Sequence, residues 1–357
     1  MSRERVVVAM SGGVDSAVAA ARCVAAGWEV VGISLRLAPD GAGSCCSLDD
    51  FHDARATADR LGFPHYVFDL RDAFARHVVR PFVAEYLAGR TPNPCARCNE
   101  HVKLGLLWER ARELGATRLA TGHYARVGTD PVTGRHCLRA AADATKDQSY
   151  FLFMLDQAAL ARTLFPVGEL AKAEVRAAAR ALGLPVADKP ESMGVCFVPD
   201  GDVAGFVERA APDAVRPGPI VDEAGRVLGR HAGVHGFTVG QRRGLRIAAD
   251  APRYVRALDA ARATVTVAPA ARLRAGGLVA RETRWVAGTP PPAGTRFGAR
   301  IRHRHPPVPA RLLAAAGDEV RVAFAAGAGP AVTPGQAAVF YDGDRVLGGG
   351  WIAGDLA

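Results

Sequence analysis

Two cysteines, Cys95 and Cys98, lie three positions apart in the stretch NPCARCNEHVKLG, residues 93–105. Such a pair can hold zinc, cycle as a dithiol, ligate an iron–sulfur cluster or supply a nucleophilic thiolate. Structural zinc usually takes four ligands, and the chain has no second pair with this spacing. A redox dithiol opens a helix after a strand, whereas this pair follows proline-rich residues that we expect to form a loop. The pair by itself leaves a cluster ligand and a nucleophile open.

The remaining cysteines do not have the spacing of a disulfide framework. The chain has seven cysteines, an odd number, and Cys45 and Cys46 are adjacent. In a reducing compartment, cysteines serve metal binding or catalysis more often than structural disulfides. Cys23 in a helical pattern and Cys137 in an expected strand are typical of small core residues. Cys196 also lies among small and apolar residues, so by itself it would be assigned to the core.

A second chemical motif is AMSGGVDS, residues 9–16, between an apolar run and a helical pattern. Gly12 and Gly13 allow backbone N–H groups to turn toward an anion, and the following helix N-terminus favours negative charge. The motif lacks the Lys of the G-x-x-x-x-G-K-[ST] loop. Asp15 is instead a candidate Mg²⁺ contact and Ser16 a hydroxyl donor. The string resembles the PP-loop of ATP pyrophosphatases, which cleave ATP between its α- and β-phosphates.

Strands and helices alternate over the first 200 residues, which predicts an α/β fold with a doubly wound parallel sheet. The expected strands are 5–10, 29–37, 64–70 and 118–124, and the expected helices are 17–27, 48–62, 74–89 and 103–115. Beyond residue 205 the sequence becomes rich in Gly and Val, with short alternating runs that predict a small β-rich part and a β-barrel. We expect domains at 1–205, 206–274 and 275–357.

Charge is distributed unevenly along the chain. Residues 206–357 contain 21 Arg, no Lys and 12 acidic residues, a net charge of +9, whereas residues 1–205 have 24 basic and 24 acidic residues. This basic part favours a polyanionic partner, nucleic acid first, over a surface that is merely soluble. Every apolar run is too short to cross a membrane, and the start has no secretory signal, so we expect a cytoplasmic protein without membrane contact.

Eight motifs in order together resemble the tRNA-specific 2-thiouridylase family, from residue 6 to about residue 352. They are SGGVDS, CCSLDDFHDAR, NPCARCNEHVKLG, ATGHYAR, KDQSYFLF, ESMGVCF, FTVGQRRGL and TPGQAAVFY. Members of this family replace the C2 oxygen of the wobble uridine, U34, of tRNA with sulfur. The resemblance implies that ATP adenylates this oxygen, that a sulfur nucleophile attacks C2, and that AMP and pyrophosphate are released.

The resemblance also implies roles for single residues. Cys196 would carry the persulfide, and Cys98 would attack it as a nucleophile, forming a transient disulfide with Cys196. The residues implied in ATP binding are Ala9, Met10, Ser11, Gly12, Gly13, Val14, Asp15, Ser16, Leu35 and Gly122. The residues implied in tRNA contact are Asn93, Pro94, Cys95, His123, Lys146, Asp147, Gln148, Arg302, His303 and Gln336. The implied cofactors and partners are ATP with Mg²⁺, tRNAs for Lys, Glu and Gln, and a protein that donates persulfide sulfur.

One position departs from the family pattern, because many members have Asp where this chain has Cys95. The change makes three cysteines, Cys95, Cys98 and Cys196, candidate ligands of a [4Fe-4S] cluster with one open iron. Cluster-dependent sulfur transfer is therefore an alternative to the persulfide route. Two rival classes are another PP-loop synthetase, which would not need the cysteines, and a non-catalytic tRNA-binding module, which would not need the phosphate loop. For tRNA binding itself, we expect removal of Arg302 to weaken affinity and to flatten its salt dependence.

Overall fold

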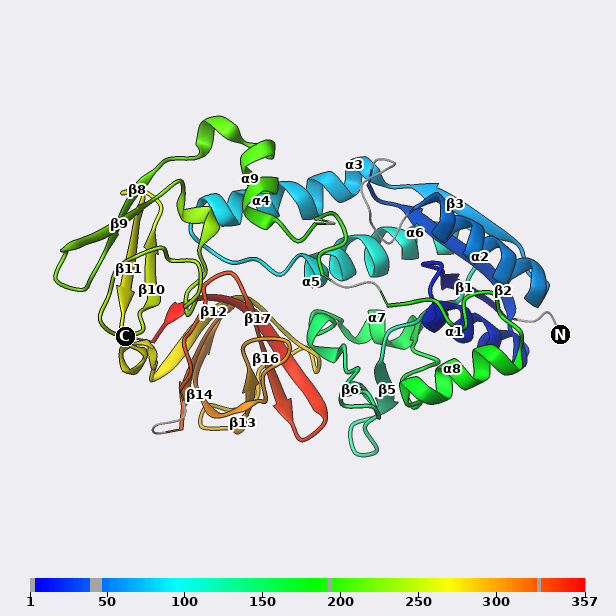
Figure 1. Cartoon of the computed structure of the whole chain (residues 1–357). Helices are drawn as coiled ribbons and strands as arrows, with labels where there is room; N and C mark the ends of the chain where they lie inside the picture. Colours follow the sequence, from blue (N-terminus) through cyan, green and yellow to red (C-terminus); the bar gives the residue numbers. More distant parts are fainter. Residues whose placement is uncertain (1–3, 39–46, 192–193, 199, 326–328, 357) are drawn as a thin grey trace.

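The computed structural model describes residues 4–38, 47–191, 194–198, 200–325 and 329–356, so Cys45 and Cys46 lie outside the described residues. Figure 1 shows a parallel sheet with its helices at one end of the molecule, a barrel beside it, and a small β-rich part at the other end, near the C-terminus. The predicted combination of an α/β sheet domain, a small β-rich part and a C-terminal barrel is confirmed.

The N-terminal sheet is five-stranded and wholly parallel, in the order β3-β2-β1-β4-β7. Its strands are β1 (Arg5–Ala9), β2 (Glu29–Arg36), β3 (His65–Asp69), β4 (Arg118–Thr121) and β7 (Thr163–Leu164). Side chains alternate between the two faces of a strand, so Val6 and Val8 of β1 enter one core cluster and Val7 enters another. Both faces of the sheet are therefore buried under helices, which explains the continuous apolar run of β1.

Helices cover the sheet on its two faces. On the face of Val6 and Val8 lie α1 (Val14–Ala25) and α2 (Leu48–Leu61). The opposite face shares its core cluster with α3 (Arg71–Phe74), π-helical η1 (Ala75–Val79), α4 (Arg80–Leu87), α5 (Pro94–Cys98), π-helical η2 (Asn99–Leu106) and α6 (Leu107–Glu113), of which α4 and α5 reach beyond the sheet. Further along the chain are η3 (Ser149–Phe151), α7 (Gln157–Arg162), α8 (Lys172–Ala181) and α9 (Val203–Ala210), and α8 packs on α1.

The predicted loop around the two cysteines is wrong, because Cys95 and Cys98 lie in helix α5. Pro94 occupies the first turn, where proline has no N–H to lose, and the Oδ1 of Asn93 accepts a bond from the Ala96 N–H at 3.2 Å. Proline and asparagine at this spacing are a helix start rather than a turn. The helix follows a loop after α4 and not a strand, so it still differs from a thioredoxin-type pair.

The C-terminal part is a closed barrel of six strands. In barrel order these are β12 (Gly277–Trp285), β15 (Glu319–Phe324), β14 (Val308–Ala316), β13 (Arg296–Arg300), β16 (Ala337–Asp342) and β17 (Arg345–Asp355). Pairing of β12 with β17 closes it. A hairpin of the N-terminal part, β5 (Ala125–Thr129) and β6 (His136–Ala140), extends this sheet by pairing β6 with β17. The hairpin thus ties the barrel to the α/β sheet domain.

The small β-rich part has four strands in the order β10-β11-β8-β9. They are β8 (Gly218–Val221), β9 (Val227–His231), β10 (Tyr254–Asp259) and β11 (Thr264–Ala268), with short helices η4 (Pro212–Ala214), η5 (Val234–Gly236) and η6 (Ala270–Leu273) nearby in the chain. Across the described residues, no helix has the length and apolar character needed to span a membrane.

Candidate active site

The phosphate loop between β1 and α1 has the geometry that its glycines predict. Gly12 has a φ of +71°, and a Cβ there would lie 2.3 Å from the Asp50 carbonyl oxygen, so only glycine fits. The Ser11 N–H donates to Ser16 Oγ at 3.2 Å, and this hydroxyl donates to the Gly13 carbonyl at 3.0 Å. These bonds hold the loop tightly against the N-terminus of α1. The arrangement is an anion cradle.

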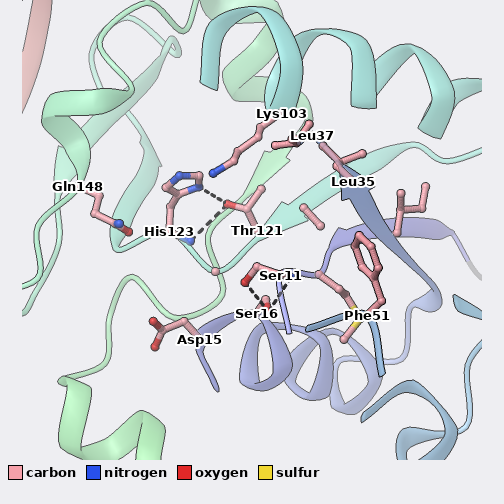
Figure 2. Close-up of a pocket in the computed structure, with 14 residues that line it drawn as sticks. Ser11, Asp15, Ser16, Leu35, Leu37, Phe51, Lys103, Thr121, His123 and Gln148 are labelled. Carbon is pink, nitrogen blue, oxygen red and sulfur yellow. Dashed lines mark hydrogen bonds between the residues drawn. The ribbon is translucent and has the colours of Figure 1, made fainter. Parts of the chain in front are cut away.

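A pocket opens directly over this loop (Figure 2). Seven of the ten residues predicted to bind ATP line it: Ala9, Met10, Ser11, Asp15, Ser16, Leu35 and Gly122. Gly12, Gly13 and Val14 belong to the loop and the first residue of α1 but do not line the pocket. A Cβ on Gly122 would lie 2.6 Å from the Ser16 nitrogen, so a glycine is required where the segment after β4 approaches the phosphate loop.

Five more lining residues were not predicted: Ile33, Leu37, Phe51, Lys103 and Thr121. Ile33, Leu35 and Leu37 alternate along β2 and the residue after it, a period of two that the sequence already contained. With Phe51 from α2 they form an apolar wall on one side of the pocket (Figure 2). An apolar wall beside an anion cradle fits a planar ring that carries phosphates.

Two lysines missed by the sequence analysis hold the phosphate loop. Lys172 Nζ contacts Asp15 Oδ1 at 2.6 Å and Oδ2 at 2.8 Å, and the Tyr124 hydroxyl donates to the same carboxylate at 2.7 Å. Lys189 Nζ donates to the Gly12 carbonyl at 3.1 Å and to the carboxylates of Asp50 and Asp53. Burial lowers the pKa of Lys189, but its bonds to these carboxylates outweigh burial and raise it.

Asp15 is the residue predicted to contact Mg²⁺. A carboxylate at the rim of an anion cradle is a suitable oxygen ligand for this ion. Both of its oxygens bind Lys172, so an ion at Asp15 would share the carboxylate with this ammonium group or displace it. Burial and the bond to Asp15 both raise the pKa of Tyr124, which keeps its hydroxyl a donor to Asp15.

His123 and Gln148, which were predicted to contact tRNA, line the same pocket as the phosphate loop. His123 Nδ1 lies 2.8 Å from Thr121 Oγ1, and Gln148 Oε1 accepts from the Tyr124 N–H at 2.9 Å. Burial, with a smaller contribution from Lys103, lowers the pKa of His123 to about 3. The imidazole is therefore neutral at pH 7 and available as a hydrogen-bond donor or acceptor.

The cysteines differ in their surroundings. Cys98, 6% exposed, and Cys196, partly buried, contact the same hydrophobic core cluster, whereas Cys95 is exposed at the start of α5. Among the described residues, no group of three or more His, Cys, Asp or Glu side chains lies close enough to hold a metal ion. Cys95, Cys98 and Cys196 therefore do not gather as ligands of a [4Fe-4S] cluster in the described part of the chain.

Several residues predicted to contact tRNA make bonds between parts of the protein. Asp147 is buried and pairs with Arg300 of β13 at 2.8 Å, and His303 Nε2 lies 3.2 Å from the Asp147 carbonyl oxygen. Gln336 Nε2 donates to the carbonyls of Thr91 and Pro92, just before α5. These contacts join the barrel to the α/β sheet domain.

Arg302 joins the barrel to the small β-rich part. Its guanidinium donates to the Val239 carbonyl at 3.0 Å and to Thr333 Oγ1 at 2.8 Å. Lys146 pairs with Glu191 at 2.8 Å. Asn93 caps α5, Pro94 stands in its first turn, and neither role requires a nucleic acid. Contact of these residues with tRNA stays a prediction.

The comparisons with known proteins cover nearly the whole chain. The family described as "tRNA methyl transferase HUP domain" matches residues 4–200, "tRNA methyl transferase PRC-barrel domain" matches 204–269, and "Aminomethyltransferase beta-barrel domain" matches 275–352. A relative from Geotalea uraniireducens (strain Rf4) is 51% identical over 98% of this chain and 95% of its own length. One from Solibacter usitatus (strain Ellin6076) is 50% identical over 99% of this chain and 100% of its own.

Both relatives are named tRNA-specific 2-thiouridylase MnmA. Among solved structures, "U34-tRNA thiolase NcsA from Methanococcus maripaludis with its [4Fe-4S] cluster" is 17% identical, with a TM-score of 0.37 over 60% of this chain and 69% of that chain. At about half identity over nearly the full length of both relatives, the chain belongs to the tRNA-specific 2-thiouridylase family.

Proposed function

We propose that the protein is an ATP-dependent tRNA-uridine 2-sulfurtransferase, which replaces the C2 oxygen of the wobble uridine with sulfur. The observation that carries this proposal is that one continuous helical segment joins the two chemical motifs. Cys98 ends α5, η2 begins at the next residue, and Lys103 of η2 lines the pocket over the phosphate loop. A segment that carries the nucleophile and also lines the pocket over the anion cradle fits adenylation followed by sulfur transfer at the same uridine.

Adenylation is the step that the pocket supports. The apolar wall of Ile33, Leu35 and Phe51 suits adenine, and the N–H groups at the start of α1 suit the phosphates. The uridine O2 attacks the α-phosphorus, the bond to the β-phosphate oxygen breaks, and pyrophosphate leaves with the electron pair. Mg²⁺, when bound at Asp15, would neutralise phosphate charge. The poor leaving group at C2 thereby becomes AMP.

Sulfur transfer is assigned to the two core cysteines. A donor protein places a persulfide on Cys196, which is partly exposed. The Cys98 thiolate attacks the inner sulfur, a Cys98–Cys196 disulfide forms, and the terminal sulfur leaves as sulfide with the electron pair. Sulfide adds to C2 and AMP leaves, and a thiol reductant then restores both cysteines.

The proposed partners follow from the same reaction. The substrate would be a tRNA with a wobble uridine, those for Lys, Glu and Gln first, and the basic residues after 205 would bind its phosphates. The division into domains at 1–205, 206–274 and 275–357 belongs to this proposal. A PP-loop synthetase of another kind would not use Cys98 and Cys196, and a tRNA-binding module would not turn over ATP.

Mass spectrometry of tRNA nucleosides tests the proposal. We expect 2-thiouridine when the protein is incubated with ATP, tRNA and a persulfide donor, and none with Cys98→Ser or Cys196→Ser. Cys23→Ala is the matched control, because Cys23 is buried in α1 away from both core cysteines. Cys95→Ala should keep activity. Thiolation that persists in both serine variants would refute the cysteine mechanism, and methylated uridine in its place would refute sulfur transfer.

A further inference from the structure

Lysine is rare in this chain, and its positions are not random. The sequence contains 41 Arg and four Lys: Lys103, Lys146, Lys172 and Lys189. Three of them contact the phosphate loop or line its pocket, and the fourth, Lys146, is linked to them through Glu191. Lys103 lines the pocket, Lys172 binds Asp15, Lys189 binds the Gly12 carbonyl, and Lys146 shares Glu191 with Lys172. Basic side chains elsewhere in the chain are arginines, whereas this site has lysines.

The contacts explain the choice for two of the lysines. Lys172 Nζ has Asp15 Oδ1, Asp15 Oδ2 and Glu191 Oε1 within 3.1 Å. Lys189 Nζ likewise has three oxygens around it, from Gly12, Asp50 and Asp53. A compact tetrahedral ammonium can point its N–H groups at three acceptors around one atom, whereas a planar guanidinium cannot.

Lys103 has a different position. Among the described residues that line the pocket it is the one with a cationic side chain, since His123 is neutral at pH 7. Figure 2 shows its ammonium group directed toward His123, across the pocket from Ser11, Ser16 and Asp15. Lys103 follows Cys98 by five residues through a π-helical segment. A π-helix bonds backbone groups five residues apart, and such turns are frequent at functional sites.

We propose that Lys103 and Lys172 both bind the phosphate chain of ATP, Lys103 from across the pocket and Lys172 from its place beside Asp15. Lys103, on the segment that also carries Cys98, contacts the α-phosphate. Lys172, whose ammonium group binds Asp15 and Glu191 before ATP enters, turns one N–H to the pyrophosphate that leaves on the Asp15 side. Lys189 is a positioning residue that fixes Gly12. This inference rests on the proposed function, because it takes ATP as the ligand of the pocket.

Negative charge grows on the α-phosphoryl oxygens as uridine attacks, and on pyrophosphate as it leaves. A fixed cation at each end of the phosphate chain of ATP stabilises both of these charges, and the residues that bind adenine need not move. Lys103 would remain on the phosphate of the adenylated uridine after pyrophosphate has left, and would stabilise AMP as the leaving group. Binding of AMP therefore reports on Lys103, and binding of pyrophosphate reports on Lys172.

Calorimetric titration with AMP and with inorganic pyrophosphate tests this division. Lys103→Met should weaken AMP binding by at least about tenfold and leave pyrophosphate binding nearly unchanged, because a charge-assisted hydrogen bond is lost at one end only. Lys172→Gln should do the reverse, and it keeps a donor beside Asp15, so the loop stays folded. Lys103→Arg and Lys172→Arg should fail to restore the lost affinity.

Arg110→Lys is the control for basic-residue exchange, because Arg110 is exposed on α6 and pairs with Glu113. It should leave both affinities and thiolation unchanged. Three results would overturn the inference even if the wild type thiolates tRNA. They are an unaltered AMP affinity in Lys103→Met, equal losses of AMP and pyrophosphate affinity in either variant, and full affinity in the arginine variants. A wild type that binds neither ligand and releases no pyrophosphate would overturn the proposed function as well.

Discussion

His123 shows how a single residue is set by its surroundings. It is held by Thr121, packs edge-to-face against Phe165 and faces the charge of Lys103. Burial and that charge disfavour its protonated form, so the pKa falls to about 3. In the unfolded chain the same imidazole titrates near its ordinary value of 6.5. Protonation therefore favours unfolding, and the site contains a neutral imidazole at physiological pH.

The pH dependence of stability checks this residue. Above about pH 6.5 both states carry a neutral imidazole and the effect is absent; as the pH falls toward 3, only the unfolded state gains the proton. We expect His123→Gln to be less acid-sensitive than the wild type, by on the order of 1–2 kcal/mol in unfolding free energy between pH 7 and pH 5. Denaturant titrations at both pH values measure it. His52→Gln, on α2 outside the pocket lining, is the control, and equal pH slopes for His123→Gln and wild type would contradict the prediction.

At the scale of elements, α5 and η2 connect the two motifs. Asn93 starts the segment by capping α5, Cys98 ends α5, and η2 continues without a break to Leu106. A helix of five residues makes few intrahelical hydrogen bonds, so its stability depends on its cap and on packing. The orientation of Cys98 therefore depends on Asn93.

Removing the Asn93 cap tests whether Asn93 positions Cys98 for thiolation or only contributes to the stability of the fold. Asn93→Ala should lower unfolding free energy by about 1 kcal/mol and should also slow thiolation, since Cys98 loses its fixed position. Asp156→Ala removes the equivalent cap from α7, where Asp156 accepts from the Ala159 N–H at 2.7 Å, away from Cys98. It should cost similar stability and leave thiolation unchanged. Thermal unfolding and tRNA mass spectrometry measure the two effects, and equal loss of thiolation in both variants would argue against the positioning role.

In the whole molecule, the α/β sheet domain and the barrel share one hydrophobic cluster. Val339 and Val346 of the barrel belong to the same core as Val7 and Cys98. The β5–β6 hairpin, the Asp147–Arg300 pair and the Gln336 bonds add polar connections. The barrel therefore holds the segment before α5 in place. Division of the chain near residues 205 and 275 stays a prediction.

The Asp147–Arg300 pair is the sharpest test of this coupling. Arg300→Met would leave the buried Asp147 carboxylate without its charged partner, so we expect a loss of about 2–4 kcal/mol in unfolding free energy. Arg180→Met breaks the exposed pair with Asp188 and should cost at most about 1 kcal/mol. Chemical denaturation compares them. If the two variants lose equal stability, the buried pair does not couple the barrel to the α/β sheet domain.

The sequence alone determined the order of strands and helices, because apolar runs and the glycines that end helices act locally: β1, α1, β2, α2 and β3 lie where their periodicity places them. It also determined the phosphate loop, because Gly12 and Gly13 predicted a turn between a strand and a helix, and the structure has such a turn there, with Gly12 at a φ of +71°. Only the tertiary structure decided which distant groups meet. Lys172 and Lys189 reach Asp15 and Gly12 across more than 150 residues, and Arg302 binds the protein itself. Packing between elements sets such contacts, and no local pattern encodes them.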